Sequence, residues 1–116
     1  MAVKPLSVAM SQEGPITLVH VAGPADSENI ESWRQMLERL AHLQDALILM
    51  DCSELTYLNS RAIGLLLKYY RQIAFNRGRL AMFGVNTKLV RTLDLLHIGK
   101  ELPVYESREA ALAVLH

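Results

Sequence analysis

The run Ala46–Met50 constrains the fold of this chain more than any other segment. It consists of Ala, Leu, Ile, Leu and Met, without the alternation of polar and apolar residues that marks a half-exposed strand. Such a run is typical of a strand covered on both faces, as in a sheet packed under helices. It is also far shorter than the roughly 20 residues that a membrane-spanning helix needs. We therefore expect a central strand here, inside an α/β domain.

Strand and helix patterns alternate around this central strand. The patterns predict a hairpin of Leu6–Met10 and Ile16–Val21 with its turn at 11–15, an end to the second strand at Gly23-Pro24, and a helix from Ser27 to about Leu43 with Asp26 or Ser27 as its cap. They further predict a polar loop at 51–59, a helix from Ser60 to near Asn76-Arg77-Gly78, a strand at 80–85, a helix from Asn86 to about Leu96, a short strand at 103–105 and a helix at 108–115 capped by Ser107. This order predicts a mixed sheet of four or five strands with helices packed mainly on one face, in a single domain over residues 1–116.

The composition limits the classes of function. Lys plus Arg equals Asp plus Glu at 12 each, so the chain has no basic field to attract nucleic acid. Cys52 is the only cysteine, which excludes an internal disulfide and a cysteine-based zinc site. The first residues lack the apolar core of a signal peptide. We therefore expect a soluble cytoplasmic domain without membrane insertion, metal or cofactor.

The sequence carries no strong catalytic signature. A glycine-rich phosphate loop is missing, and the four histidines lie far apart on different predicted elements. Cys52 follows an apolar strand, where a cysteine is usually a small buried hydrophobe. Asp51 ends the central strand, where a receiver domain has its phosphoacceptor, but Glu13 is a single acid where a receiver needs a pair. We predict that Asp51 forms a turn or caps a loop, and an enzyme or receiver is the third hypothesis.

Ser60 lies where the predicted polar loop meets an apolar helix. The first four backbone N–H groups of a helix lack partners within the helix, and the helix dipole favours negative charge there. Ser60 is therefore either an N-cap or a phosphoacceptor, since a phosphate of charge about −1.5 to −2 is tolerated at this end of a helix. The local physics alone leaves both roles open.

The segment from Asp51 to Gly64 resembles the signature of STAS domains, which occur in anti-sigma factor antagonists and in the tails of sulfate transporters. The residues that fit the signature are Asp51, Ser53, Leu55, Tyr57, Leu58, Ser60, Ile63 and Gly64. Weaker matches extend over nearly the whole chain, at 23–26, 77–80 and 90–93. The resemblance implies a STAS fold and a role in protein binding.

This resemblance implies a switch centred on Ser60. In anti-sigma factor antagonists, a partner that is both serine kinase and anti-sigma factor phosphorylates the matching serine, and a phosphatase restores it. The unphosphorylated domain binds that partner and frees the sigma factor, and the domain itself is not an enzyme. We expect a monomer or weak dimer. The predicted partner-binding surface consists of Asp26, Asn59, Ser60, Arg61 and Gly64.

Two departures from the signature qualify this expectation. Asn59 replaces the usual aspartate, and Arg61-Ala62 replaces Ser/Thr-Gly. Arg61 is suited to pair with a phosphate or an acidic partner. A second hypothesis is therefore a STAS subunit with a structural or regulatory role in a lipid or anion transport assembly, without phosphorylation.

The sequence also supports predictions for three other positions near Ser60. Because glycine inside a helix costs about 1 kcal/mol relative to alanine, we expect the helix backbone at Gly64 to approach a neighbour closely. Leu58 and Leu65 belong either to a docking patch or to the core.

Overall fold

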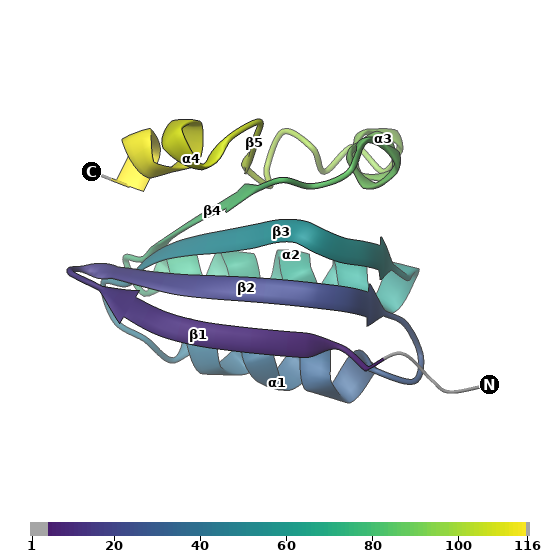
Figure 1. Cartoon of the computed structure of the whole chain (residues 1–116), viewed down its shortest axis with the longest axis horizontal. Helices are drawn as coiled ribbons and strands as arrows, with labels where there is room; N and C mark the ends of the chain where they lie inside the picture. Colours follow the sequence, from purple (N-terminus) through teal and green to yellow (C-terminus); the bar gives the residue numbers. More distant parts are fainter. Residues whose placement is uncertain (1–4, 116) are drawn as a thin grey trace.

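The protein is a five-stranded mixed sheet whose strands lie side by side in chain order, seen in a computed structural model that describes residues 5–115 (Figure 1). The strands are β1 (Ser7–Glu13), β2 (Ile16–Ala25), β3 (Leu47–Leu58), β4 (Arg79–Phe83) and β5 (Val104–Tyr105). The helices are α1 (Ile30–Ala41), α2 (Ser60–Phe75), α3 (Thr87–Leu95) and α4 (Arg108–Leu115). β1 is antiparallel to β2, and the other neighbouring strands are parallel.

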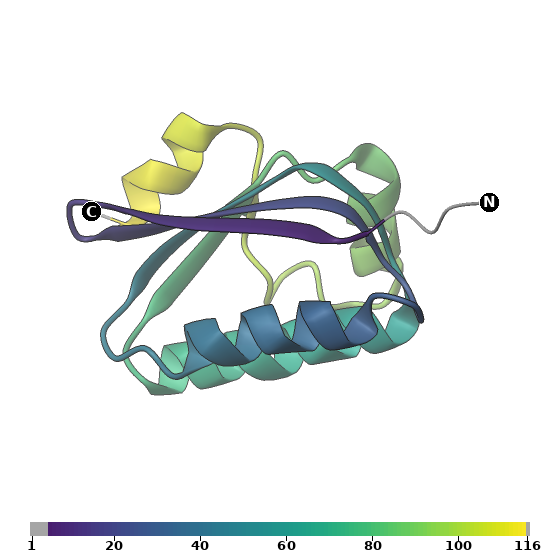
Figure 2. The same cartoon turned by 60° about the horizontal axis from the view of Figure 1, so that its bottom comes forward.

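Helices cover the two faces of the sheet unequally. Figure 2 shows α1 and α2 side by side under one face and α4 on the other. Ile48 and Met50 contribute to the core on the side of α1 and α2, whereas Leu49 packs in a smaller cluster with residues of α4. The apolar run at 46–50 is therefore buried from both sides, as its pattern predicts. The expected α/β fold with helices mainly on one face is confirmed.

The C-terminal half follows its local signals closely. Asn86 caps α3, because its side-chain oxygen accepts the Leu89 N–H at 2.9 Å. Ser107 caps α4, because its hydroxyl oxygen accepts the Ala110 N–H at 3.1 Å. The short strand predicted around Val104 is present as β5. These predictions are confirmed because each depends on a few adjacent residues.

The predicted ends of two strands are wrong. β2 continues through Gly23-Pro24 to Ala25, and β3 continues through the supposed polar loop to Leu58. The pairing of β1 with β2 ends at Ala22, so within residues 5–115 Pro24 lies where β2 pairs with β3 alone, a position that tolerates proline. β4 likewise ends opposite Asp51, so among the described residues the rest of β3 pairs with β2 alone, and it buries Cys52, Leu55 and Leu58 between exposed residues.

The predicted start of the first helix is also wrong. Residues 26–29 form a separate turn, in which the Asp26 carboxylate accepts the N–H groups of Glu28 at 3.0 Å and Asn29 at 3.1 Å. α1 begins only at Ile30, with Asn29 at its N-cap position. Asp26 therefore stabilises the turn before the helix instead of capping the helix. Within residues 5–115, no helix is both long and apolar enough to cross a membrane.

Candidate functional site

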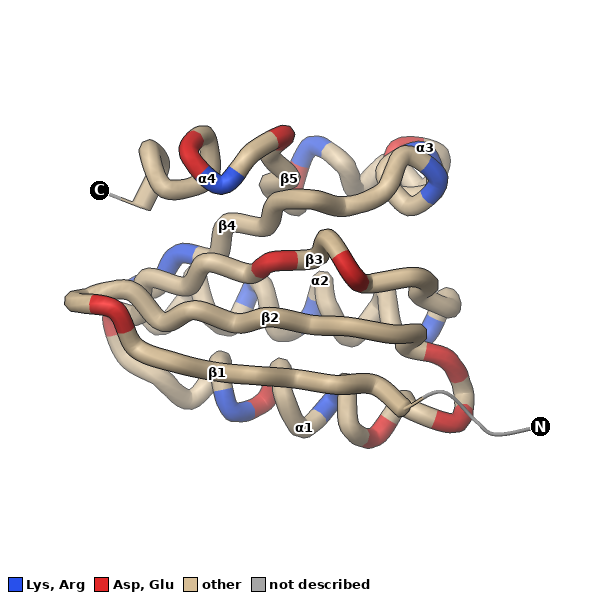
Figure 3. Tube along the Cα trace, viewed as in Figure 1, with Lys and Arg blue, Asp and Glu red and all other residues tan. Residues whose placement is uncertain are grey.

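Two chain junctions meet at the carboxyl end of the central strands. The Asn59 N–H, just after β3, donates a hydrogen bond to the Ala25 carbonyl at the end of β2, with a length of 3.1 Å. This bond places the loop that begins at Asp26 beside the first turn of α2. Figure 3 shows the acidic residues of that loop at the end of the sheet where β2 and β3 finish. Asp26, Asn59 and Ser60, which the sequence selects separately, therefore lie in one region.

The cap of α2 is Asn59, and Ser60 is the first residue of the helix. The Asn59 side-chain oxygen accepts the Ala62 N–H at 2.8 Å, the bond that a capping aspartate would also make. The Ser60 side chain is exposed, and its hydroxyl makes no hydrogen bond within the described part of the chain. The capping role considered for Ser60 thus belongs to its neighbour. Asn59 preserves the cap of the family signature without its negative charge.

A buried tryptophan fixes the first turn of α2 against α1. The Trp33 indole N–H donates to the Ala62 carbonyl at 2.9 Å, and Trp33 is fully buried. Ala62 is also fully buried, so the helix start is held by packing as well as by its cap. This contact gives Ser60 a rigid support.

Arg61 is the cation next to Ser60, and no acidic residue occupies the first turn of α2. Its side chain is exposed and lies within electrostatic range of Glu31 on α1. A hydrogen bond from Arg34 is the main cause that lowers the pKa of the Glu31 carboxyl, and the charge of Arg61 adds to it. An anion at Ser60 would lie at the N-terminal end of α2, where the unpaired helix amides favour negative charge.

Gly64 follows one turn later on α2, and the expectation that the backbone there approaches a neighbour closely is wrong. A Cβ atom built at Gly64 meets no heavy atom of its surroundings within 4 Å, and the residue is exposed. Packing inside the chain therefore gives no reason for a glycine there. Gly64 therefore leaves open space on the surface of α2, four residues after Ser60.

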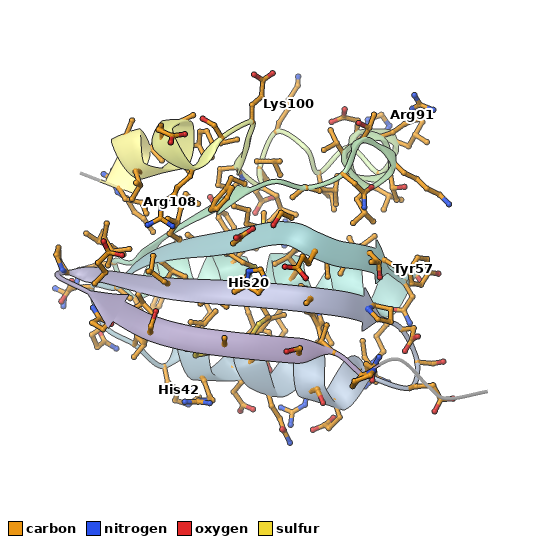
Figure 4. All side chains as sticks on the ribbon, in the orientation of Figure 1. His20, His42, Tyr57, Arg91, Lys100 and Arg108 are labelled. Carbon is orange, nitrogen blue, oxygen red and sulfur yellow. The ribbon has the colours of Figure 1, made fainter. Side chains whose placement is uncertain are left out.

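The exposed apolar residue at this end is Tyr57, which the sequence does not distinguish from its neighbours. Leu58 is 5% exposed and belongs to the core, while Leu65 packs partly against the core. Tyr57 is 47% exposed and lies at the carboxyl end of β3 (Figure 4). The alternation of Tyr57 and Leu58 along a strand explains the difference, but it becomes a usable signal only if this segment is recognised as strand.

A second polar cluster lies on β2 and β3. Asp51 accepts the Ser53 N–H at 2.9 Å, and its other oxygen lies 3.2 Å from Nδ1 of His20. Nε2 of the same imidazole is 3.2 Å from the Glu54 carboxylate. Burial raises the pKa of the Asp51 carboxyl, but the hydrogen bonds from Ser53 and His20 outweigh it and leave the pKa below its usual value. The prediction that Asp51 forms a turn or caps a loop is wrong, because Asp51 lies inside β3 and accepts these hydrogen bonds within the strand.

Cys52 follows Asp51 in β3, and its side chain is buried in the hydrophobic core. Burial, with the Asp51 charge as a smaller cause, raises the pKa of the Cys52 thiol to about 12. The interpretation of Cys52 as a small buried hydrophobe is confirmed. His42 and His97 lie at the ends of α1 and α3. Within residues 5–115, no group of three or more His, Cys, Asp or Glu side chains is placed to hold a metal ion.

Comparison with known proteins identifies the family. The family model of the STAS domain matches residues 7–111. The anti-sigma F factor antagonist of Paenibacillus polymyxa is 27% identical over 111 residues, which cover 95% of each chain. A solved anti-sigma factor antagonist from Mycobacterium paratuberculosis superimposes with a TM-score of 0.78 at 19% identity, covering 95% of this chain and 93% of that one. A sulfate transporter family protein from Wolinella succinogenes gives a TM-score of 0.74 at 13% identity, covering 89% and 86%. The chain therefore belongs to the STAS domain family.

Proposed function

We propose that this protein is an anti-sigma factor antagonist whose partner binding is controlled by phosphorylation of Ser60. The observation that carries the proposal is that the helix cap and the exposed hydroxyl at the start of α2 belong to two different residues. Asn59 caps the helix, and the adjacent Ser60 hydroxyl is exposed and free of hydrogen bonds within the described residues. A kinase can therefore modify Ser60 without removing the cap. The relative from Paenibacillus polymyxa, an anti-sigma F factor antagonist by name, supports the same role.

The proposed switch acts on the partner and leaves the fold intact. A phosphate at the first position of α2 adds about −1.5 to −2 charge at a helix end that favours anions. Arg61 is available to pair with that phosphate, because its side chain is exposed. The partner, which binds the surface formed by Asp26, Asn59, Ser60, Arg61 and Gly64, loses a contact when Ser60 carries the phosphate.

The partners proposed for this surface are a serine kinase that is also an anti-sigma factor, and a phosphatase that reverses the modification. In this scheme the protein regulates transcription indirectly and performs no catalysis itself. Since sigma factors and their regulators act on RNA polymerase, we propose a cytoplasmic location.

Incubation with the serine-kinase anti-sigma factor encoded in the same genome tests this proposal. We expect ATP-dependent addition of one phosphate, mapped to Ser60 by mass spectrometry and lost in Ser60→Ala. Thr87→Ala is the matched control, since Thr87 is also an exposed first residue of a helix capped by asparagine. The proposal is overturned if Ser60 receives no phosphate and Ser60→Asp binds the partner as the unmodified protein does.

A second candidate function is a STAS subunit of a lipid or anion transport assembly. The fold similarity to a sulfate transporter family protein favours it, as do the departures from the signature at Asn59 and Arg61. In this case the protein copurifies with an ATPase or membrane subunit, and Ser60→Ala and Ser60→Asp leave that association unchanged.

A further inference from the structure

α2 differs from the other helices because its charged side chains are all cations. It contains Arg61, Lys68 and Arg71 and has no Asp or Glu. The other helices each contain at least one acid, namely Glu31 and Glu38 in α1, Asp94 in α3 and Glu109 in α4. All three cations of α2 are exposed. The helix therefore presents a basic surface to solvent.

Exposed residues of α2 follow one line along the helix. Their spacing of three or four residues places them on one face, and they are Ser60, Gly64, Lys68, Arg71 and Phe75. We call these five residues the outer face of α2. Arg61 lies beside this face in the first turn and is also exposed. The outer face therefore begins at Ser60 and continues to the last residue of the helix.

Two of the three cations of α2 keep their charge without an ion pair. Arg71 binds Glu101 through hydrogen bonds of 2.6 and 2.9 Å, so its charge is offset inside the chain. Arg61 and Lys68 make no ion pair with any residue that the structure describes. Glu31, which lies within electrostatic range of Arg61, already has an arginine partner on α1. The outer face and its border therefore have an excess of positive charge.

The outer face ends at Phe75, whose side chain is 86% exposed, the largest fraction among the large apolar side chains of residues 5–115. A single exposed aromatic residue needs no explanation by itself. Phe75, however, shares its face with Gly64, where an added Cβ would meet no atom within 4 Å. Neither residue serves the packing of this chain. Aromatic side chains are frequent anchors of protein interfaces, and a glycine lets a partner approach the helix backbone closely.

We propose that the outer face of α2 is one continuous docking surface for the anti-sigma partner, and that the partner meets it with an acidic surface. Carboxylates of the partner lie opposite Arg61 and Lys68, and an apolar pocket of the partner receives Phe75. Opposite charges across an interface favour the correct partner and speed encounter. The 16 residues of α2 span about 24 Å, a length that fits within a standard interface of about 800 Å² per partner. This inference rests on the proposed function, because it gives the chemistry of the same partner.

An acidic partner also explains how a phosphate on Ser60 releases the complex. The phosphate adds about −1.5 to −2 charge at one end of the outer face. It repels the partner's carboxylates and competes with them for Arg61. Binding of the unmodified chain should therefore weaken as the salt concentration rises, because salt screens the attraction between exposed charges.

Substitution of Lys68 tests the acidic character of the partner. Isothermal titration calorimetry measures the Kd between the unphosphorylated full chain and the serine-kinase anti-sigma factor encoded in the same genome. We expect Lys68→Gln to weaken binding about threefold and Lys68→Glu about tenfold, since an exposed ion pair is first lost and then replaced by repulsion. The Kd of Lys68→Gln should also depend less on salt. Lys88→Glu is the matched control, because Lys88 is an exposed cation on α3, and it should bind like the unmodified chain.

Substitution of Phe75 tests how far the surface extends along α2. Phe75→Ala removes the proposed anchor at the end of the helix far from Ser60, and we expect the Kd to rise about tenfold. Phe75→Leu keeps an apolar side chain and should lose less. Leu95→Ala is the matched control, because Leu95 is 73% exposed at the end of α3. Phosphorylation of Ser60, followed in parallel by mass spectrometry, reports on the proposed function separately.

Three outcomes would overturn this inference. In the first, Lys68→Glu or Phe75→Ala binds like the unmodified chain while Ser60 still receives its phosphate, which would leave the proposed function intact. In the second, Lys68→Glu binds more tightly, which would show that the partner's surface is basic. In the third, the chain forms no complex with the anti-sigma factor, which would overturn the proposed function as well, and cosedimentation with phosphatidylserine vesicles would then assign the outer face to a lipid surface. Because both side chains are exposed, urea denaturation of the variants should match that of the unmodified chain, so a loss of binding reports on the surface.

Discussion

The starts of α2 and α3 are nearly identical in local chemistry and differ in what surrounds them. Asn59-Ser60-Arg61 and Asn86-Thr87-Lys88 each provide an asparagine cap, an exposed hydroxyl and an exposed cation. The capping bonds are 2.8 Å to the Ala62 N–H and 2.9 Å to the Leu89 N–H. Neither hydroxyl makes a hydrogen bond within the described residues. Helix-start chemistry alone therefore does not select Ser60 over Thr87.

The surroundings separate the two helix starts. The first turn of α2 receives the Trp33 indole N–H and lies beside the loop that starts at Asp26, whereas the cap of α3 donates from its amide to the Leu55 carbonyl at 3.4 Å. Five residues after its cap, α2 has the open Gly64 and α3 has Arg91. A partner that distinguishes the two helix starts would do so through the loop at Asp26, the open position at Gly64 and the support from Trp33.

Removing the rigid support should have the largest effect on stability. Trp33→Ala deletes a fully buried aromatic side chain and its hydrogen bond to Ala62, so we expect a loss of about 3–5 kcal/mol in the free energy of unfolding. Urea denaturation followed by circular dichroism measures it. Trp33→Phe keeps most of the volume and should lose less. A loss below about 1 kcal/mol for Trp33→Ala would show that α2 is not anchored in this way.

Removing either cap should have a moderate and similar effect. Asn59→Ala and Asn86→Ala each leave a helix amide without its capping partner, which costs about 1 kcal/mol. The same denaturation experiment applies. Ser60→Ala and Thr87→Ala are controls that should change stability by less than about 0.5 kcal/mol, since neither hydroxyl is bonded. Equal losses in Ser60→Ala and Asn59→Ala would contradict the assignment of the cap.

Filling the open spot on α2 should separate stability from partner binding. Gly64→Ala adds a Cβ that meets no atom within 4 Å, so we expect the free energy of unfolding to rise by about 0.5–1 kcal/mol. Under the proposed function, the same change weakens binding of the anti-sigma partner. Arg91→Ala, the equivalent change on α3, should leave both nearly unchanged because Arg and Ala have similar helix propensities. A destabilised Gly64→Ala would mean that the helix needs the glycine for its own packing.

The contrast between the two helix starts also explains which elements can be predicted from the sequence and which cannot. The sequence predicts α3 and its cap correctly because Asn86 and the following apolar residues are local signals. The strand character of residues 51–58 depends on pairing with β2, and this pairing passes through register shifts at His20/Ala22 and Gly23/Pro24. Gly23 itself has φ +98°, and a Cβ there would lie 2.6 Å from the Pro5 carbonyl oxygen. Neither feature is visible in the pattern of a single segment.

The candidate site shows the same limit. The signature at 51–64 selects Ser60, but the bond from Asn59 to Ala25 that brings Asp26 beside it is a tertiary contact. The same holds for the Trp33 support, which comes from another helix. The open space that a Cβ at Gly64 would enter is equally a property of the fold. Sequence therefore identifies the residue, and the fold supplies its context.

The smallest expected effect tests whether the two helix starts are electrostatically equivalent. Ser60→Asp and Thr87→Asp each place a carboxylate at the first position of a helix, and each should raise the free energy of unfolding by about 0.3–1 kcal/mol at low salt. The dipole lowers the pKa of such a carboxyl in the folded state. The added stability is therefore present above the unfolded pKa of about 3.9 and disappears as the pH falls through the lower folded value. Denaturation at pH 7 and pH 3, with Ser60→Asn and Thr87→Asn as uncharged controls, measures this difference. Equal gains at both sites, combined with loss of partner binding only in Ser60→Asp, would assign the specificity to the surroundings of α2, whereas loss in both variants would locate the partner across both helix starts.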